Sequence, residues 1–132
     1  MNGQTWAVIS PAGDLTWYSQ RQTDQVRRIV AGDYAPGAIA TAWIRPPLRV
    51  MASDIALAAP EHYEANPVAR HVISGLSGGR ITQPWRGHVA LAEYEQDTGP
   101  GSIGEWLGPA EMSAAVKAAI TAAADAARKA AL

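Results

Sequence analysis

Two of the three histidines stand with two carboxylates in one stretch of twenty residues, EHYEANPVARHVISGLSGGR (61–80). A histidine beside a carboxylate can move protons in catalysis, and several such groups together can hold a metal ion. A persuasive zinc motif has two histidines one helical turn apart, and this stretch lacks that pair. Glu61, His62 and Glu64 therefore indicate a solvated loop before a helix. We expect no metal site, no cofactor and no catalytic residue.

The segment GLSGG (75–79) sets Ser77 among glycines, as in the turn that carries the nucleophile of many serine hydrolases. That turn leads from a strand into a helix, whereas Ser77 follows a predicted helix and lies at the negative end of its dipole. The glycines therefore indicate the end of a helix. A minor hydrolase that pairs His62, His71 or His88 with a carboxylate stays a second alternative function.

Arginine and tryptophan dominate recognition surfaces, and here they occur near the ends of predicted strands. Trp43 and Arg45 should share one strand face, because side chains alternate along a strand. The predicted ligand- or partner-binding residues are Trp43, Arg45, Arg49, Trp85, Arg86 and His88. The alternative is that the tryptophans fill a core that has no phenylalanine, while the arginines cover its edge.

Composition limits the classes of function. The 132 residues suit one domain, and the absence of cysteine excludes disulfides and thiol chemistry. Residues 1–90 hold eight Arg and six acids, whereas residues 91–132 hold three basic residues and six acids. A net charge of −1 does not favour binding to nucleic acid, which remains the first alternative. No leader sequence or membrane-length apolar run is evident, so we expect a cytoplasmic protein without membrane contact.

The chain order predicts an α+β domain. Two strand-like runs (5–10 and 15–20) form a hairpin, and a helix follows from Thr23 or Asp24 to Gly32. Pro46 and Pro47 separate two further strands. Asn66 should cap a helix that runs to about residue 74, and a strand begins near residue 85. We expect an antiparallel or mixed sheet of about five strands with two short helices.

The C-terminal third is predicted as a Gly/Pro loop (97–108) and a long alanine-rich helix (109–132), after a core of residues 1–96. The first half of this helix should pack on alanine-lined strand faces. The alanines concerned are Ala38, Ala40, Ala42, Ala90 and Ala92. The second half should project or meet a second copy of the chain, which gives a possible homodimer through this helix.

The order of these motifs resembles the small domain catalogued as domain of unknown function 3846, found in phage, plasmid and bacterial genomes. The resemblance covers about residues 5–95. It is carried by the segments VAG (30–32), MASD (51–54), NPVA (66–69) and WRGHVAL (85–91). The family implies a context of mobile genetic elements and brings no established activity. The expected function is a small intracellular binding or adaptor module that contacts a protein partner or an anionic small molecule.

Overall fold

One antiparallel sheet of six strands forms the centre of the protein, in a computed structural model that describes residues 3–32 and 39–130. The strands are β1 (Trp6–Ile9), β2 (Leu15–Tyr18), β3 (Ile39–Arg45), β4 (Leu48–Ser53), β5 (Val89–Gln96) and β6 (Trp106–Ala110). Their order is β2-β1-β5-β4-β3, and β6 also pairs with β5. The α+β class predicted from the sequence is confirmed.

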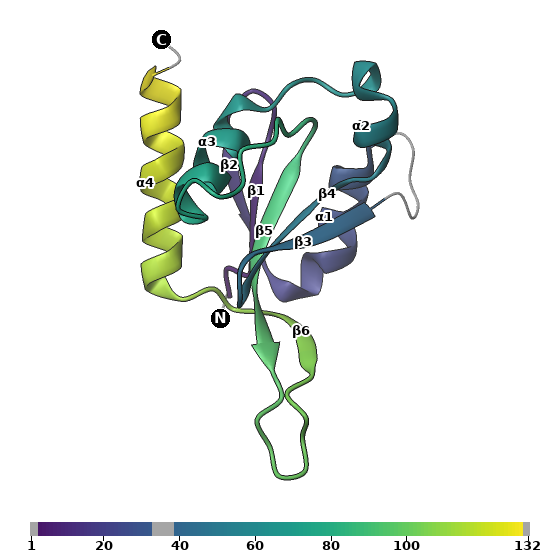
Figure 1. The fold of residues 1–132 in the computed structure, drawn as a ribbon, viewed down its shortest axis with the longest axis vertical. Coiled ribbons are helices and arrows are strands. Elements are labelled where there is room, and N and C mark those ends of the chain that lie inside the picture. Colours follow the sequence, from purple (N-terminus) through teal and green to yellow (C-terminus); the bar gives the residue numbers. More distant parts are fainter. Residues whose placement is uncertain (1–2, 33–38, 131–132) are drawn as a thin grey trace.

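Helices cover both faces of this sheet (Figure 1). They are α1 (Thr23–Ala31), α2 (Ile55–Ala58), α3 (Pro67–Leu76) and α4 (Ala114–Ala130), with the 3-10 turns η1 (Gln20–Gln22) and η3 (Pro60–His62). Side-chain alternation along the strands creates two cores. Val89 and Leu91 pack on the side of α3 and α4, whereas Ala90 and Ala92 pack on the side of α1.

Asn66 begins α3 as predicted. Its side-chain oxygen accepts a hydrogen bond from the N–H of Ala69 at 3.0 Å, which satisfies one of the free donors at the helix start. Its side-chain nitrogen donates to the carbonyl oxygens of Ile9 and Gly87, at 3.0 and 2.8 Å. The residue is 1% exposed. One buried side chain therefore joins α3, β1 and the segment that leads into β5.

The first helix differs from the prediction only at its start. Its N-cap is Gln22, so neither Thr23 nor Asp24 caps it. The Thr23 hydroxyl instead accepts a hydrogen bond from the indole N–H of Trp6 and donates to the carbonyl of Gln20. Gly32 ends the helix with a φ of 66°, a conformation that glycine adopts without strain.

The region predicted as a loop contains a strand that sequence reasoning missed. Residues 106–110 form β6, which pairs with the second half of β5, so Gly108 and Pro109 lie in a strand instead of at a helix start. Residues 95–107, called the arm below, extend from the body as a hairpin (Figure 1). The long helix begins at Ala114, where the Ser113 hydroxyl accepts a hydrogen bond from the N–H of Val116.

The packing predicted for the C-terminal helix is wrong. Ile120, Ala124 and Ala127 are all buried against α3, so the second half of α4 does not project. Small residues let two helices approach closely, and α3 offers α4 a nearer apolar face than the strands do. Ala90 and Ala92 face α1, while Ala40 and Ala42 line a cavity. Ala38 and residues 131–132 lie outside the described residues.

None of the helices in residues 3–32 and 39–130 has the length and apolar character needed to cross a membrane.

Replacement of Asn66 by alanine should lower the free energy of unfolding by at least about 3 kcal/mol. The change removes a helix cap, typically worth about 1 kcal/mol, and also leaves two carbonyl groups without a buried donor, at roughly 1–3 kcal/mol each when unsatisfied. Urea denaturation measures the loss. Ser113→Ala, which removes an exposed cap at 3.4 Å, is the matched control. Equal losses in the two variants would contradict the joining role of Asn66.

Candidate functional site: an apolar pocket beside an edge strand

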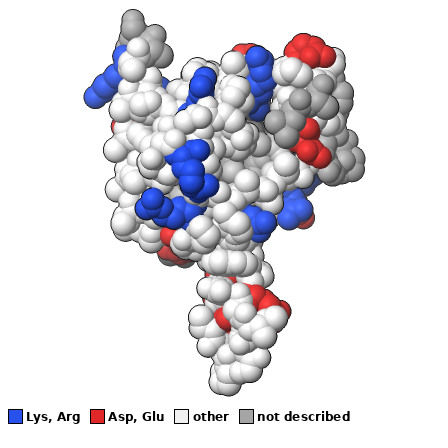
Figure 2. Space-filling view, viewed as in Figure 1, with Lys and Arg blue, Asp and Glu red and all other residues white. Residues whose placement is uncertain are grey.

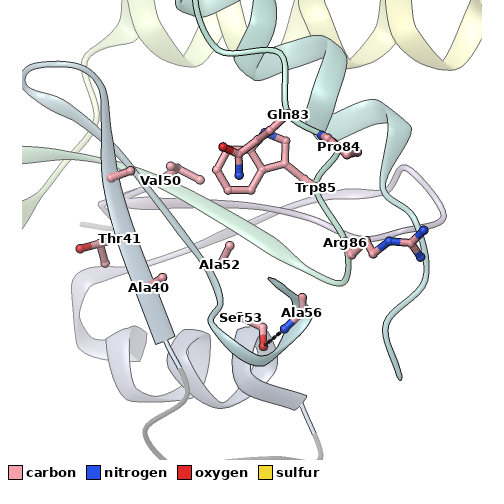
Figure 3. Close-up of a pocket in the computed structure, with 11 residues that line it drawn as sticks. Ala40, Thr41, Val50, Ala52, Ser53, Ala56, Gln83, Pro84, Trp85 and Arg86 are labelled. Carbon is pink, nitrogen blue, oxygen red and sulfur yellow. Dashed lines mark hydrogen bonds between the residues drawn. The ribbon is translucent and has the colours of Figure 1, made fainter. Parts of the chain in front are cut away.

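A pocket of about 220 Å³ lies between the β3–β4 hairpin and the segment 83–86 (Figure 3). Its wall on the strands is made of short apolar side chains, Ala40, Ala42, Val50 and Ala52. The ring of Trp85 forms the opposite wall. Alanine side chains do not fill the space between a sheet and an indole ring, so the lining leaves a hollow large enough to admit an aliphatic side chain.

The pocket opens beside an unpaired strand edge. β3 is the last strand of the sheet, and within residues 3–32 and 39–130 it pairs with β4 alone. Ala42, which lines the pocket, is exposed. At the far end of the strand, the guanidinium of Arg80 donates to the carbonyl of Ile44. Between that contact and Ile39, the outer edge offers main-chain donors and acceptors next to an apolar hollow.

Main-chain contacts fix the position of Trp85. The N–H of Asn66 donates to the carbonyl of Trp85 at 2.9 Å, and the N–H of Gly87 donates to the carbonyl of Glu64 at 2.7 Å. Gly87 has a φ of +73°, and an added Cβ would stand 2.8 Å from Cδ1 of Tyr63. Only glycine fits this turn. The segment before β5 is therefore held tightly against the start of α3.

Trp85 is 8% exposed, and its indole nitrogen is buried with no hydrogen-bond acceptor in the part of the chain described. A buried donor without an acceptor usually costs about 1–3 kcal/mol. Phenylalanine at this position would keep an aromatic wall and remove the donor.

Arg86 also lines the pocket, but its charge is directed elsewhere. Its guanidinium donates to the carbonyl oxygens of Tyr63 at 3.0 Å and Pro60 at 3.4 Å. Figure 3 shows the side chain pointing away from the two strands. This arginine therefore ties the segment before β5 to the loop after η3.

Trp43 and Arg49 are together, but on the other face of the sheet. The guanidinium of Arg49 lies 4.6 Å from the Trp43 ring centroid and 5.2 Å from that of Tyr94. Trp106 of β6 adds a further ring, 4.5 Å from Trp43. Tyr94 belongs to the core on the α1 side, whereas Trp85 belongs to the core on the α3 side. The six predicted binding residues therefore do not form one surface.

Arg45 does not share a face with Trp43. The pairing register of β3 and β4 shifts between these two residues, and a bulge of this kind redirects the side chains that follow it. The Arg45 guanidinium lies beside Gly78, just after α3, where an added Cβ would stand 3.7 Å from Nη2. The prediction that Trp43 and Arg45 share a strand face is therefore wrong.

His88 lines a separate cleft of about 240 Å³ with His62, Tyr63 and Glu64. Burial lowers the pKa of His88 below its ordinary 6.5, and the nearby Glu64 carboxylate opposes that shift in part. His71 lies at a different site, an open groove along α3. Two histidines and one acid thus line the same cleft, as the hydrolase alternative requires.

Ser77 has a structural role. Its hydroxyl donates to the carbonyl of Ser74 at 3.1 Å and accepts from the N–H of Ile81 at 2.9 Å, so it closes the end of α3. Residues 3–32 and 39–130 contain no cluster of three or more His, Asp or Glu side chains able to hold a metal ion.

The alanines of the pocket were missed as site residues. The sequence showed Ala40 and Ala42 on one strand face, which we interpreted as a surface for a helix. Prolines are tolerated at the edge of a sheet, so Pro46-Pro47 after the strand could have indicated an edge strand. Alternating alanines on such a strand could have indicated a shallow groove beside it.

Comparisons identify no relative: no family model matches the sequence, and neither a curated protein nor a solved structure does.

The His88 environment predicts a pH-dependent stability. Because the folded protein disfavours the charged imidazole, the unfolded chain takes up the proton first as pH falls below 6.5. The free energy of unfolding should therefore decrease through this range and level off below the folded pKa. Urea denaturation at a series of pH values should give a shallower slope for His88→Asn. His71→Asn, an exposed histidine, controls for the substitution, and an unchanged slope in His88→Asn would refute the assignment.

Proposed function

We propose that this protein is a small non-catalytic binding module that takes an extended segment of a partner protein along β3. One apolar side chain of that segment enters the pocket against Trp85. This is the adaptor function expected from the sequence, with the recognition site moved from an Arg/Trp surface to the edge strand. The phage or plasmid context and the resemblance to domain of unknown function 3846 remain predictions.

The observation that carries the proposal is the juxtaposition of an unpaired strand edge with an apolar pocket. Peptides that add to a sheet edge gain affinity from main-chain hydrogen bonds and specificity from pockets for alternate side chains. Here β3 supplies the edge, and Ala40 and Ala42 of the same strand line the pocket. A strand laid along β3 would therefore direct a side chain into the hollow.

The chemistry of the lining favours an apolar side chain over an anion. Among the described residues of the lining, Arg86 is the only charged one, and its guanidinium is engaged with two carbonyl oxygens. The arginines of the predicted binding surface are dispersed over both faces of the sheet. An anionic small molecule and a nucleic acid therefore have less support than a protein segment, and the hydrolase alternative belongs to the separate cleft of His62, Glu64 and His88.

The expected affinity for a short peptide is modest. Burial of one leucine side chain contributes about 1.5–3 kcal/mol, and a free peptide loses conformational entropy when it becomes a strand. Main-chain hydrogen bonds to the strand edge add roughly 0.5–1.5 kcal/mol each, so a dissociation constant of about 1 mM is expected for an isolated peptide.

Titration with a five-residue acetylated peptide that carries one central leucine between threonines and valines tests the proposal. In the NMR spectrum, the indole N–H signal of Trp85, assigned with Trp85→Phe, should shift together with the amides of β3. The signal of Trp17, on the β2 side of the sheet, should not. The same peptide with glycine in place of leucine should bind several-fold more weakly.

Two variants at alanine positions distinguish binding in the pocket from nonspecific binding. Ala42→Phe places an aromatic ring at the mouth of the pocket and should abolish the Trp85 shift. Ala118→Phe changes an equally exposed alanine on α4 and should bind like the parent protein. Equal binding by the two variants, or no shift at millimolar peptide in protein kept dilute enough to be monomeric, would end the proposal.

A further inference from the structure

The arm carries the most exposed large apolar side chains found in residues 3–32 and 39–130. Ile103 is 89% exposed and Leu107 is 60% exposed. A soluble domain that presents apolar side chains on a projecting hairpin commonly uses them in contact with another protein. Among the strands that the structure describes, β6 pairs with β5 alone, and Gln20 donates to the carbonyl of Pro109 near its end.

Ring contacts and a hydrogen bond hold the base of the arm against the body. Trp106 contacts Trp43 on β3, and Arg49 stacks on Trp43 from the neighbouring strand. Inside the hairpin, the side chain of Gln96 donates to the carbonyl of Gly104 at 2.7 Å. A surface held in its binding conformation loses little entropy on association.

The arm is acidic, and the end of β3 that it could approach is basic. Glu95, Asp97 and Glu105 lie on the arm, which contains no Lys or Arg. Figure 2 shows red side chains and no blue ones on the arm, whereas blue side chains are spread over the visible face of the body. Exposed Arg45 and Arg80 flank the Ile44 end of β3.

The charge of the surface changes from one end of β3 to the other, which would orient a charged segment bound along this strand. Asp54 follows β4 at the opposite end of the pocket, beyond Ser53. An acidic segment is therefore attracted to the Arg45 end and disfavoured at the Asp54 end. The glutamates of the arm should lie near Arg45 while its apolar side chains reach the pocket.

We propose that the segment bound along β3 is the arm of a second copy of this chain, with Ile103 or Leu107 entering the Trp85 pocket. This inference rests on the proposed function and names its partner. Each copy carries both an arm and a pocket, so two reciprocal contacts close a two-fold dimer. The lengths are similar: the seven residues of β3 span about 23 Å, and the seven residues 101–107, which carry Ile103 and Leu107, would span about the same when extended.

The homodimer expected through α4 rested on a projecting second half of that helix. α4 is packed along α3 instead, so that reason no longer applies. The proposed dimer uses different surfaces, and the two can be told apart by substitution.

Sedimentation equilibrium of the full chain from about 10 to 500 µM tests the inference. The parent protein should approach twice the monomer mass. Ile103→Ser combined with Leu107→Ser, and separately Ala42→Phe, should each raise the dissociation constant by at least about tenfold, as expected for loss of a buried aliphatic side chain. Ala118→Phe should leave the dissociation constant unchanged. Added salt should raise the dissociation constant of the parent protein, because it screens the attraction between opposite charges across the contact.

A mixture of the arm variant and the Ala42→Phe variant tests the reciprocal contact most directly. The arm variant keeps its pocket and the Ala42→Phe variant keeps its arm, so a mixture of the two can form one of the two contacts. The mixture should associate more strongly than either variant alone. A dimer insensitive to both changes, or a mixture no stronger than its components, would overturn the inference.

The leucine peptide distinguishes failure of this inference from failure of the proposed function. Its titration is done on the arm variant, in which the pocket has no competing arm. A parent protein that stays monomeric while the peptide shifts the Trp85 signal would refute the second copy as partner and keep the binding function. A pocket that takes neither arm nor peptide would refute both.

Discussion

The placement of the segment before β5 depends on the buried side chain of Asn66. Its three hydrogen bonds reach α3, β1 and Gly87, and its backbone N–H bonds to Trp85. An amide is well suited to this position because it offers both an acceptor for the helix start and two donors for carbonyl groups. The position of the Trp85 ring, and with it the pocket, follows from this one network.

The two faces of the sheet have different roles. On the α1 side, Trp43, Arg49 and Tyr94 make a stacked group that supports the base of the arm. On the other side, α4 packs beside α3 instead of over β3 and β4. The short side chains of those strands then remain beside a hollow that Trp85 closes on one side only. The guanidinium of Arg49 and the pocket beside Trp85 therefore lie on opposite faces of the sheet.

Local signals predicted most elements. Side-chain alternation correctly placed Ala90 and Ala92 on one face of β5, and Asn66-Pro67 correctly marked the start of α3. The failures occurred where local preference competes with pairing. Gly108 and Pro109 suggest a helix start, yet they lie in β6, because the second half of β5 offers a pairing partner. Alanine likewise has a high helix propensity everywhere, but only a partner helix decides which alanines are buried.

The sequence by itself determined the α+β class, the hairpin of β1 and β2, the break between β3 and β4 at Pro46-Pro47, the capped start of α3 and the uneven charge between the body and the C-terminal third. These follow from propensity, side-chain alternation and composition, which act over a few residues. Only the tertiary structure decided that Trp43 and Trp85 lie on opposite faces, that a bulge turns Arg45 away from Trp43, and that β3 is an edge strand. Those outcomes depend on which strands pair and which helix covers which face, and such long-range choices leave no periodic trace in the chain.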